Sequence, residues 1–200
     1  MPAAMTEYRS PIRTFGPELQ RQLPSDTEPV VSRALRFAEH AHGSQRRPLG
    51  EPYVEHLREV IAVLVDGLGF TDADLLVAAA LHDVVEDTDT TIDQIREEFG
   101  DKVAALVGWV TKDPVEDRQI YLARLADAPS EAVLLKLADR LSNVQRLDTH
   151  PRPDKRARYY TETVEWIVPL AARDPWFSIW FGEWQSHFEW LMPAGEDQAG

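Results

Sequence analysis

The sequence predicts an all-α fold of about eight to ten helices. Apolar residues recur with the 3.6-residue period of helices along most of the chain, whereas almost no segment alternates with the period of two that a half-buried strand shows. Ser, Thr and Asp stand before several of these periodic runs, as helix N-caps do. The chain has 200 residues, which is enough to bury one core, and no clear linker divides it.

The two ends of the chain are expected to differ from the rest. Residues 1–24 show no sustained period and contain several prolines, so we interpret them as an irregular arm. Residues 25–192 are expected to form a single domain. Residues 193–200 are polar and are expected to fray.

The first helices follow directly from the apolar pattern. A helix is expected from about Val30 to Gly43, after N-cap candidates at residues 25–28. Residues 44–52 form a basic loop with Pro and Gly. The second helix has its apolar side over residues 54–65.

The third helix is expected from Leu75 to about Glu86. Thr71 and Asp74 resemble a capping box in front of it. The helix is apolar on all sides as far as His82, which predicts a place in the middle of the bundle.

The later helices are shorter, apart from one long helix. Thr91 and Gln94 form a second capping box before a helix that ends at Phe99 and Gly100. The remaining helices are expected at about residues 103–110, 120–126, 131–147, 155–172 with an interruption at Pro169, and 175–190.

The composition excludes several classes of protein. The chain has no cysteine, which rules out disulfides, thiolate metal sites and cysteine nucleophiles. Its 34 acidic and 21 basic residues give a net charge of −13, which argues against binding to long nucleic acids. No run of about 18 apolar residues indicates a membrane span, and no signal peptide is recognisable. We therefore expect a cytoplasmic protein without a membrane partner.

A group of ionisable residues follows the apolar third helix. His82 and Asp83 come first, and Glu86 and Asp87 lie one helical turn further on. Burying such groups without partners costs several kcal/mol, so they either hydrogen-bond the end of the helix or form half of a divalent metal site.

The long helix carries a second polar group within an apolar sequence. Asp139 and Asn143 are i,i+4 neighbours, with Lys136 and Arg140 close by. A salt bridge of Asp139 to one of these cations is the simpler interpretation. His56 at the start of the second helix completes a nitrogen and oxygen ligand set on three helices, which suits a hard or borderline metal.

Motifs around these residues recur in the order known from one enzyme family. They are Ala-His-Gly-Ser-Gln-Arg-Arg (41–47), Gly-Glu-Pro-Tyr-Val-Glu-His (50–56), Ala-Ala-Leu-His-Asp-Val-Val-Glu-Asp-Thr (79–88), Phe-Gly (99–100), Leu-Lys-Leu-Ala-Asp-Arg-Leu-Ser-Asn (135–143), Arg-Pro-Asp-Lys-Arg (152–156) and Glu-Thr-Val-Glu (162–165). The chain thereby resembles the HD-domain metal-dependent phosphohydrolases, and among them the RelA/SpoT hydrolase domain. It is similar to the standalone small alarmone hydrolases of the metazoan SpoT homologue class.

The resemblance implies an HD-type helical bundle that uses manganese to hydrolyse the 3′-pyrophosphate of (p)ppGpp to GDP or GTP and pyrophosphate. It implies that the metal ligands are His56, His82, Asp83 and Asp139. It implies that the residues acting on the attacking water are Glu86 and Asp87. It implies that the small anionic nucleotide is contacted by Arg46, Arg47, Lys136, Asn143 and Tyr160, with Tyr159 as the alternative to Tyr160 and core packing open for both.

Two other functions stay open. Pro48 stands where the small hydrolases often carry a second basic residue, so an HD phosphohydrolase on another nucleotide, such as (p)ppApp or NADPH, is one alternative. An antitoxin or regulatory protein that acts mainly through binding is the other. Its contact surface would be the aromatic C-terminal helix, where Trp176, Trp180, Trp184 and Phe188 form one stripe that we expect to pack in the core or in an oligomer.

Overall fold

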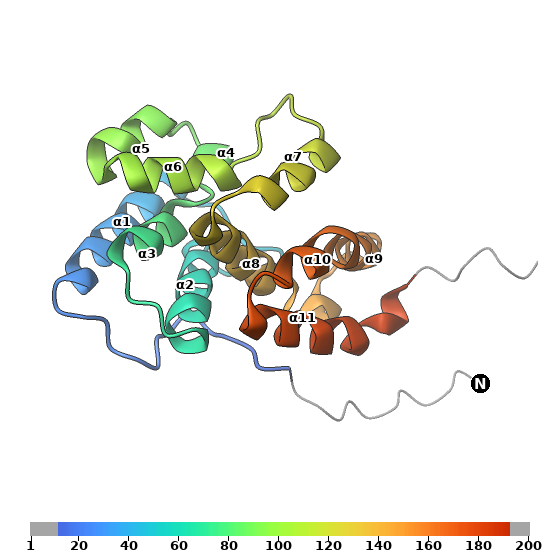
Figure 1. The fold of residues 1–200 in the computed structure, drawn as a ribbon. Coiled ribbons are helices and arrows are strands. Elements are labelled where there is room, and N and C mark those ends of the chain that lie inside the picture. The colour runs from blue at the N-terminus through green and yellow to red at the C-terminus, as the bar shows by residue number, and fades with distance from the viewer. Residues whose placement is uncertain (1–11, 193–200) are drawn as a thin grey trace, which may run out of the picture.

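The computed structural model describes residues 12–192, which form a bundle of helices and confirm the all-α class (Figure 1). Within these residues no strand forms, and an isolated bridge joins Arg46 to Pro52. None of the described helices is long and apolar enough to cross a membrane. The α-helices are α1 (Thr27–His42), α2 (Val54–Ala62), α3 (Ala73–Leu81), α4 (Val84–Asp87), α5 (Ile92–Phe99), α6 (Asp101–Val110), α7 (Arg118–Arg124), α8 (Ser130–Val144), α9 (Pro153–Glu162), α10 (Val168–Ala171) and α11 (Pro175–His187).

Helices α3 and α8 form the middle of the molecule. Every residue from Leu75 to Leu81 in α3 is buried, as its uniformly apolar sequence predicts. Helix α3 packs against α1, α2 and α6, and α8 packs against α2, α3 and α6. Figure 1 shows α8 between the helices of the N-terminal half and the group formed by α9, α10 and α11.

The start and end of α3 differ from the prediction. Asp72 caps this helix by accepting a hydrogen bond from the Leu75 N–H (2.9 Å), in place of a capping box from Thr71. The expected helix to residue 86 is interrupted after Leu81, and α4 begins at Val84. The His82 ring lies 2.9 Å from the Ala79 carbonyl, which would otherwise accept the backbone N–H of residue 83 in a continuous α-helix.

The expected interruption at Pro169 does not occur. A π-helical turn over Thr163–Ile167 joins α9 to α10, so the chain stays helical past the proline. Proline has no N–H to donate to the preceding turn, and the wider turn accommodates that loss without ending the helix. A similar π-turn, Val63–Gly67, extends α2.

The described part of the predicted N-terminal arm, residues 12–24, contains no helix, as expected, yet it is fixed to the domain. Ile12 and Phe15 are buried in the core. The Asp66 carboxylate accepts the backbone N–H groups of residues 20 and 21 (2.9 Å each). Residues 1–11 of the predicted arm and the predicted frayed tail, 193–200, lie outside the described residues.

The aromatic residues of the C-terminal helix pack in the core of the same chain. We call the buried residues Phe177, Trp180, Phe181, Trp184 and Phe188 the aromatic cluster. The Trp184 indole N–H donates to the Val144 carbonyl at the end of α8 (2.9 Å), and its ring stacks on Tyr160. The expected core packing is confirmed, while an oligomer or protein partner for this helix stays a prediction.

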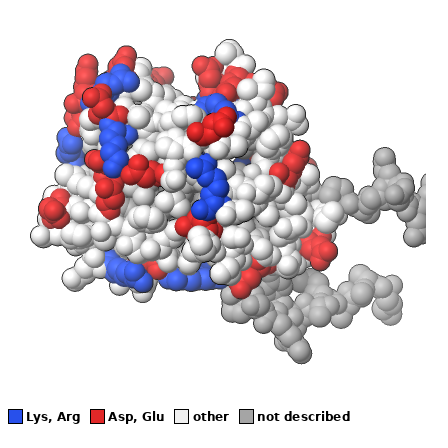
Figure 2. Space-filling model, in the orientation of Figure 1, with Lys and Arg blue, Asp and Glu red and all other residues white. Residues whose placement is uncertain are grey.

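The surface charge follows the acidic composition. On the face drawn in Figure 2, acidic side chains gather along the raised upper edges, and Lys and Arg occur in small separate groups at the upper left, in the middle and along the lower edge. A long nucleic acid needs a continuous basic surface, which this face does not offer.

Candidate metal centre and pocket

Four side chains from separate parts of the fold meet at one point. His56 lies in the first turn of α2, His82 and Asp83 follow the end of α3, and Asp139 lies in α8. Each offers one ligand atom, and these atoms all lie within 4.8 Å of one another. We call these residues the four-residue cluster; they are the four side chains that the sequence predicts as metal ligands.

The two imidazole Nε2 atoms occupy the centre of the four-residue cluster. They lie 3.2 Å apart. His56 Nε2 is 3.3 Å from Asp83 Oδ2 and 3.3 Å from Asp139 Oδ1. His82 Nε2 is 3.1 Å from Asp83 Oδ2 and 3.6 Å from Asp139 Oδ1. Two nitrogens and two carboxylate oxygens therefore converge, which is a ligand set for a divalent cation of hard or borderline character.

Both rings are held from the side opposite the centre. His82 Nδ1 lies 2.9 Å from the Ala79 carbonyl, which can only accept, so Nδ1 carries the proton. His56 Nδ1 lies 2.9 Å from the Ser142 hydroxyl. Hydrogen bonds of this kind fix the tautomer of a metal-binding histidine and turn its other nitrogen toward the ion.

The electrostatics of the cluster favour positive charge at its centre. Burial alone lowers the pKa of His82, but the carboxylates of Asp83 and Asp139 outweigh it and raise that pKa well above its usual value. For His56 the same carboxylates outweigh burial and raise the pKa. A divalent cation supplies positive charge at this point, so the residues present fit a metal ion.

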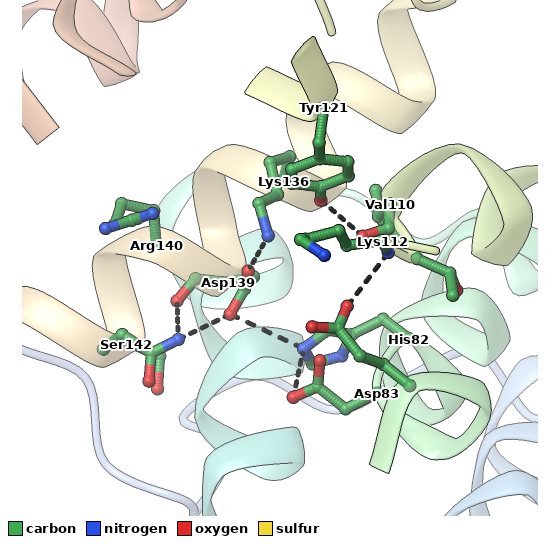
Figure 3. A network of polar contacts seen from close by, with 12 residues as sticks. His82, Asp83, Val110, Lys112, Tyr121, Lys136, Asp139, Arg140 and Ser142 are labelled. Atoms are coloured by element: carbon green, nitrogen blue, oxygen red, sulfur yellow. Dashed lines mark hydrogen bonds and ion pairs between the residues drawn. The ribbon is translucent and has the colours of Figure 1, made fainter. Parts of the chain in front are cut away.

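Asp139 is also held by two neighbours on α8 (Figure 3). Lys136 Nζ lies 2.7 Å from Asp139 Oδ2, and the Asn143 amide donates to Asp139 Oδ1 (2.6 Å). Burial alone lowers the pKa of Lys136, but the Asp139 carboxylate outweighs it and raises that pKa, so the ammonium keeps its charge. The simple salt bridge that the sequence suggested is present, and it coexists with the cluster. Arg140 points away and pairs with Glu162.

The other carboxylate of the cluster is oriented by Tyr53, to which the sequence analysis gave no role. Its hydroxyl donates to Asp83 Oδ2, and its ring lies edge-on to His56. Burial and the neighbouring Asp83 carboxylate raise the pKa of Tyr53, so the hydroxyl keeps the proton that it donates. Tyr53 was visible in the motif 50–56, but only its position beside Asp83 reveals this contact.

The two predicted catalytic carboxylates lie beside the four-residue cluster and outside it. Both belong to the short helix α4 and are exposed. Glu86 Oε2 accepts the backbone N–H of Lys112 (3.0 Å), and Asp87 Oδ2 accepts the side-chain amide of Gln45 (2.9 Å). The helix is interrupted at residues 82–83, so both carboxylates lie on α4, where the Asp87 N–H still donates to the Asp83 carbonyl in the expected i,i+4 relation (2.9 Å).

A pocket opens next to His56. Three of the predicted substrate residues, Arg46, Arg47 and Asn143, line it. Two do not: Lys136 contacts Asp139, and Tyr160 is buried against Trp184. Of the two tyrosines that the sequence offers, Tyr159 lines the pocket, whereas the ring of Tyr160 faces the core, the alternative left open for both. The lining residues without a predicted site role are Pro48, Leu49, Glu51, Tyr53, Ser142, Arg146, Thr149, His150 and Lys155.

Comparison with known proteins supports this arrangement. Residues 34–113 match the HD domain family. The chain is 42% identical over 151 residues to the guanosine-3′,5′-bis(diphosphate) 3′-pyrophosphohydrolase of Aquifex aeolicus, covering 72% of this chain and 21% of that protein. It is 43% identical over 152 residues to a probable GTP pyrophosphokinase of Mycobacterium leprae, covering 72% and 19%. The chain thus spans about a fifth of the length of these curated relatives.

One solved structure matches this chain over nearly the whole length of the solved chain. It is described as "A metazoan ortholog of SpoT hydrolyzes ppGpp and plays a role in starvation responses". The TM-score is 0.73 at 30% identity, and the match covers 82% of this chain and 96% of that one. The chain therefore belongs to the HD-domain family and is homologous to the hydrolase domain of SpoT and RelA.

Proposed function

We propose that this protein is a metal-dependent hydrolase of (p)ppGpp, which releases pyrophosphate from the 3′ position and leaves GDP or GTP. The reaction cleaves the bond between the 3′ oxygen and phosphorus, with water as the nucleophile. The main support for this proposal is that the four-residue cluster, His56, His82, Asp83 and Asp139, lies beside a pocket lined by arginines. The match to 96% of a chain described as hydrolysing ppGpp supports the substrate.

We propose that the four-residue cluster binds Mn²⁺. When bound, a divalent ion lowers the pKa of water and offsets phosphate charge, an effect worth several kcal/mol. Two imidazoles and two carboxylates suit this ion, and an octahedral ion would keep positions for water and substrate. Lys136 and Asn143 hold Asp139 in place, and Tyr53 holds Asp83.

We assign the handling of the attacking water to Glu86 and Asp87. Their carboxylates are accessible, and they lie on the helix that begins directly after Asp83. A positioned carboxylate that takes a proton from water contributes about 10²–10⁴-fold to the rate. The Lys112 N–H and the Gln45 amide orient these carboxylates.

We assign recognition of the nucleotide to the basic wall of the pocket. The side-chain N–H of Arg47 donates to the buried Glu59 carboxylate (2.8 Å), so its planar group has a fixed orientation. A guanidinium held in this way stacks on a purine base, as lysine does not. Arg46 and Asn143 add polar contacts on the same wall. We also propose that the protein is cytoplasmic and that its substrate is a small anionic nucleotide.

The test is hydrolysis by the purified protein with Mn²⁺ of ppGpp, pppGpp, ppApp and NADPH, with His82→Ala and Asp83→Ala as controls. Release of pyrophosphate from ppGpp that both variants lose is the expected result. Activity on ppApp or NADPH alone would mean that this nucleotide, and not (p)ppGpp, is the substrate. Binding of ppGpp without hydrolysis, together with no metal uptake, would favour the antitoxin or regulatory alternative.

A further inference from the structure

A buried carboxylate outside the four-residue cluster connects the cluster, the pocket and the N-terminal arm. Glu59 lies on α2 three positions after His56, and it is only 2% exposed. A carboxylate removed from water in this way requires partners, because burying it alone is costly. Glu59 stands within a helix whose other residues from 60 onward are apolar, and this was the sequence signal for it.

Both carboxylate oxygens of Glu59 are used. Oε2 accepts hydrogen bonds from Arg47 (2.8 Å), from the Ser142 hydroxyl (2.7 Å) and from the Gln145 amide (3.1 Å). Oε1 accepts from Arg146. Three of these partners, Arg47, Ser142 and Arg146, line the pocket.

The contact with Ser142 reaches the metal centre. Ser142 has one hydroxyl proton, which it donates to Glu59. Its oxygen can therefore only accept from His56 Nδ1, at 2.9 Å. His56 must then carry its proton on Nδ1, and its Nε2 faces Asp83 and Asp139.

The contact with Gln145 reaches the arm. The Gln145 amide also donates to the Phe15 carbonyl (3.0 Å), and its oxygen accepts the Phe15 N–H (2.7 Å). Each of these groups is buried, so the hydrogen bonds have no competition from water. Glu59 thus accepts hydrogen bonds from three places: Arg47 in the loop before α2, Ser142 in α8, and the two residues that follow α8, Gln145 and Arg146.

We propose that Glu59 is a positioning residue, which holds His56 in its metal-binding tautomer through Ser142 and holds Arg47 against the pocket. This inference rests on the proposed function of the cluster and pocket. A purely structural ion pair would stabilise the fold and leave metal affinity and KM unchanged. A positioning residue changes metal affinity through Ser142 and KM through Arg47.

The chain offers variants that separate these effects. Glu59→Gln removes the charge at nearly constant volume and affects both branches. Ser142→Ala breaks only the link to His56 and leaves Arg47 and Arg146 paired with Glu59. Asp66→Asn is the matched control, because Asp66 is another buried carboxylate on the same helical stretch, and it holds the arm without contacting the cluster or the pocket.

The experiment measures the Kd for Mn²⁺ by calorimetry, kcat and KM for ppGpp at saturating Mn²⁺, and Tm for each variant. We expect Glu59→Gln and Ser142→Ala to bind Mn²⁺ about 10–100-fold more weakly, as is typical for partners of metal ligands. Only Glu59→Gln should also raise KM. Asp66→Asn should lower Tm and keep the wild-type Kd and KM.

Wild-type Kd for Mn²⁺ in both Glu59→Gln and Ser142→Ala would overturn the proposal while leaving the proposed function intact. If Glu59→Gln does not fold, wild-type affinity in Ser142→Ala overturns it. A wild-type protein that takes up no Mn²⁺ and hydrolyses no ppGpp would overturn the proposed function, and this inference with it.

Discussion

The four-residue cluster and the aromatic cluster both pack against α8, yet they are held together by different interactions. At Val144 the helix meets Trp184, which stacks on Tyr160 and donates one hydrogen bond. Five residues earlier, Asp139 contacts two imidazoles and lies close to the Asp83 carboxylate. The aromatic contacts gain free energy by burial, whereas the polar ones bring like charges together and need a cation between them.

The two kinds of contact indicate different roles for the two regions. Burial of large aromatic rings is sufficient to explain the aromatic cluster as part of the fold. The close approach of Asp83 and Asp139 has no comparable gain in the fold alone, so a bound ligand explains it better. Substitutions in one region should therefore change metal binding and rate, and substitutions in the other should change stability.

The largest expected effect comes from removing one ligand of the four-residue cluster. His82→Gln should abolish the rise in Tm that Mn²⁺ causes in the wild type, since a ligand stabilises only the form that binds it. It should lower kcat by about 10³-fold or more, because several kcal/mol of charge stabilisation in the transition state are lost. Each loss of about 1.36 kcal/mol lowers the rate tenfold. Differential scanning calorimetry with and without Mn²⁺ checks this, and an unchanged rise in Tm contradicts it.

The counterpart in the aromatic cluster is Trp184→Ala. Removing a fully buried Trp should cost about 3–5 kcal/mol of unfolding free energy. For a chain of this size that lowers Tm by about 6–20 °C. The Mn²⁺-induced rise in Tm and the kcat at a low temperature should remain. A Trp184→Ala variant that is folded by circular dichroism but inactive would contradict the view that the aromatic cluster affects only stability.

A smaller effect is expected at α4, where the polar residues are exposed. Glu86→Gln should lower kcat by about 10²-fold or more, because a carboxylate that handles the attacking water is removed. Its unfolding free energy should change by no more than about 0.5 kcal/mol, as for most surface substitutions. Glu97→Gln, another exposed glutamate on the neighbouring helix α5, is the matched control and should keep the wild-type rate. Equal rates for both variants would remove Glu86 from the mechanism.

The smallest effect concerns the ion pair on the other side of α8, where Glu162 contacts Arg140 and Arg118. Burial alone raises the pKa of Glu162, but the two arginines outweigh it and lower the pKa from 4.5 to about 2. Its contribution to stability is present above pH 4.5 and is lost as the pH falls toward about 2. The free energy of unfolding, measured with urea at several pH values, should fall less on acidification in Glu162→Gln than in the wild type. An identical pH dependence in both proteins would contradict the assignment.

The sequence predicted the cluster residue by residue, because its members are ionisable groups within apolar helices and recur in a known order. The all-α class and the capping box of Thr91 and Gln94 were predicted for similarly local reasons and are confirmed. Local patterns did not show the interruption at His82 or the π-turn before Pro169, because both depend on hydrogen bonds that form only in the fold.

The supporting residues were the least predictable part of the site. Glu59 and Ser142 lie 83 positions apart, and their contact arises from the packing of α2 against α8. The resemblance leaves open whether Tyr159 or Tyr160 lines the pocket, and one residue of helical rotation separates the ring that faces the pocket from the ring that faces the core. Such choices depend on how helices are rotated against one another, which a single helix does not determine.

Binding of Mn²⁺ by the four-residue cluster is tested by a crystal structure of the protein with Mn²⁺, in which the ion is located by anomalous scattering. We expect one anomalous peak about 2.0–2.3 Å from His56 Nε2, His82 Nε2 and one oxygen each of Asp83 and Asp139. A peak bound elsewhere, or no peak at this point at a Mn²⁺ concentration that supports activity, would contradict it.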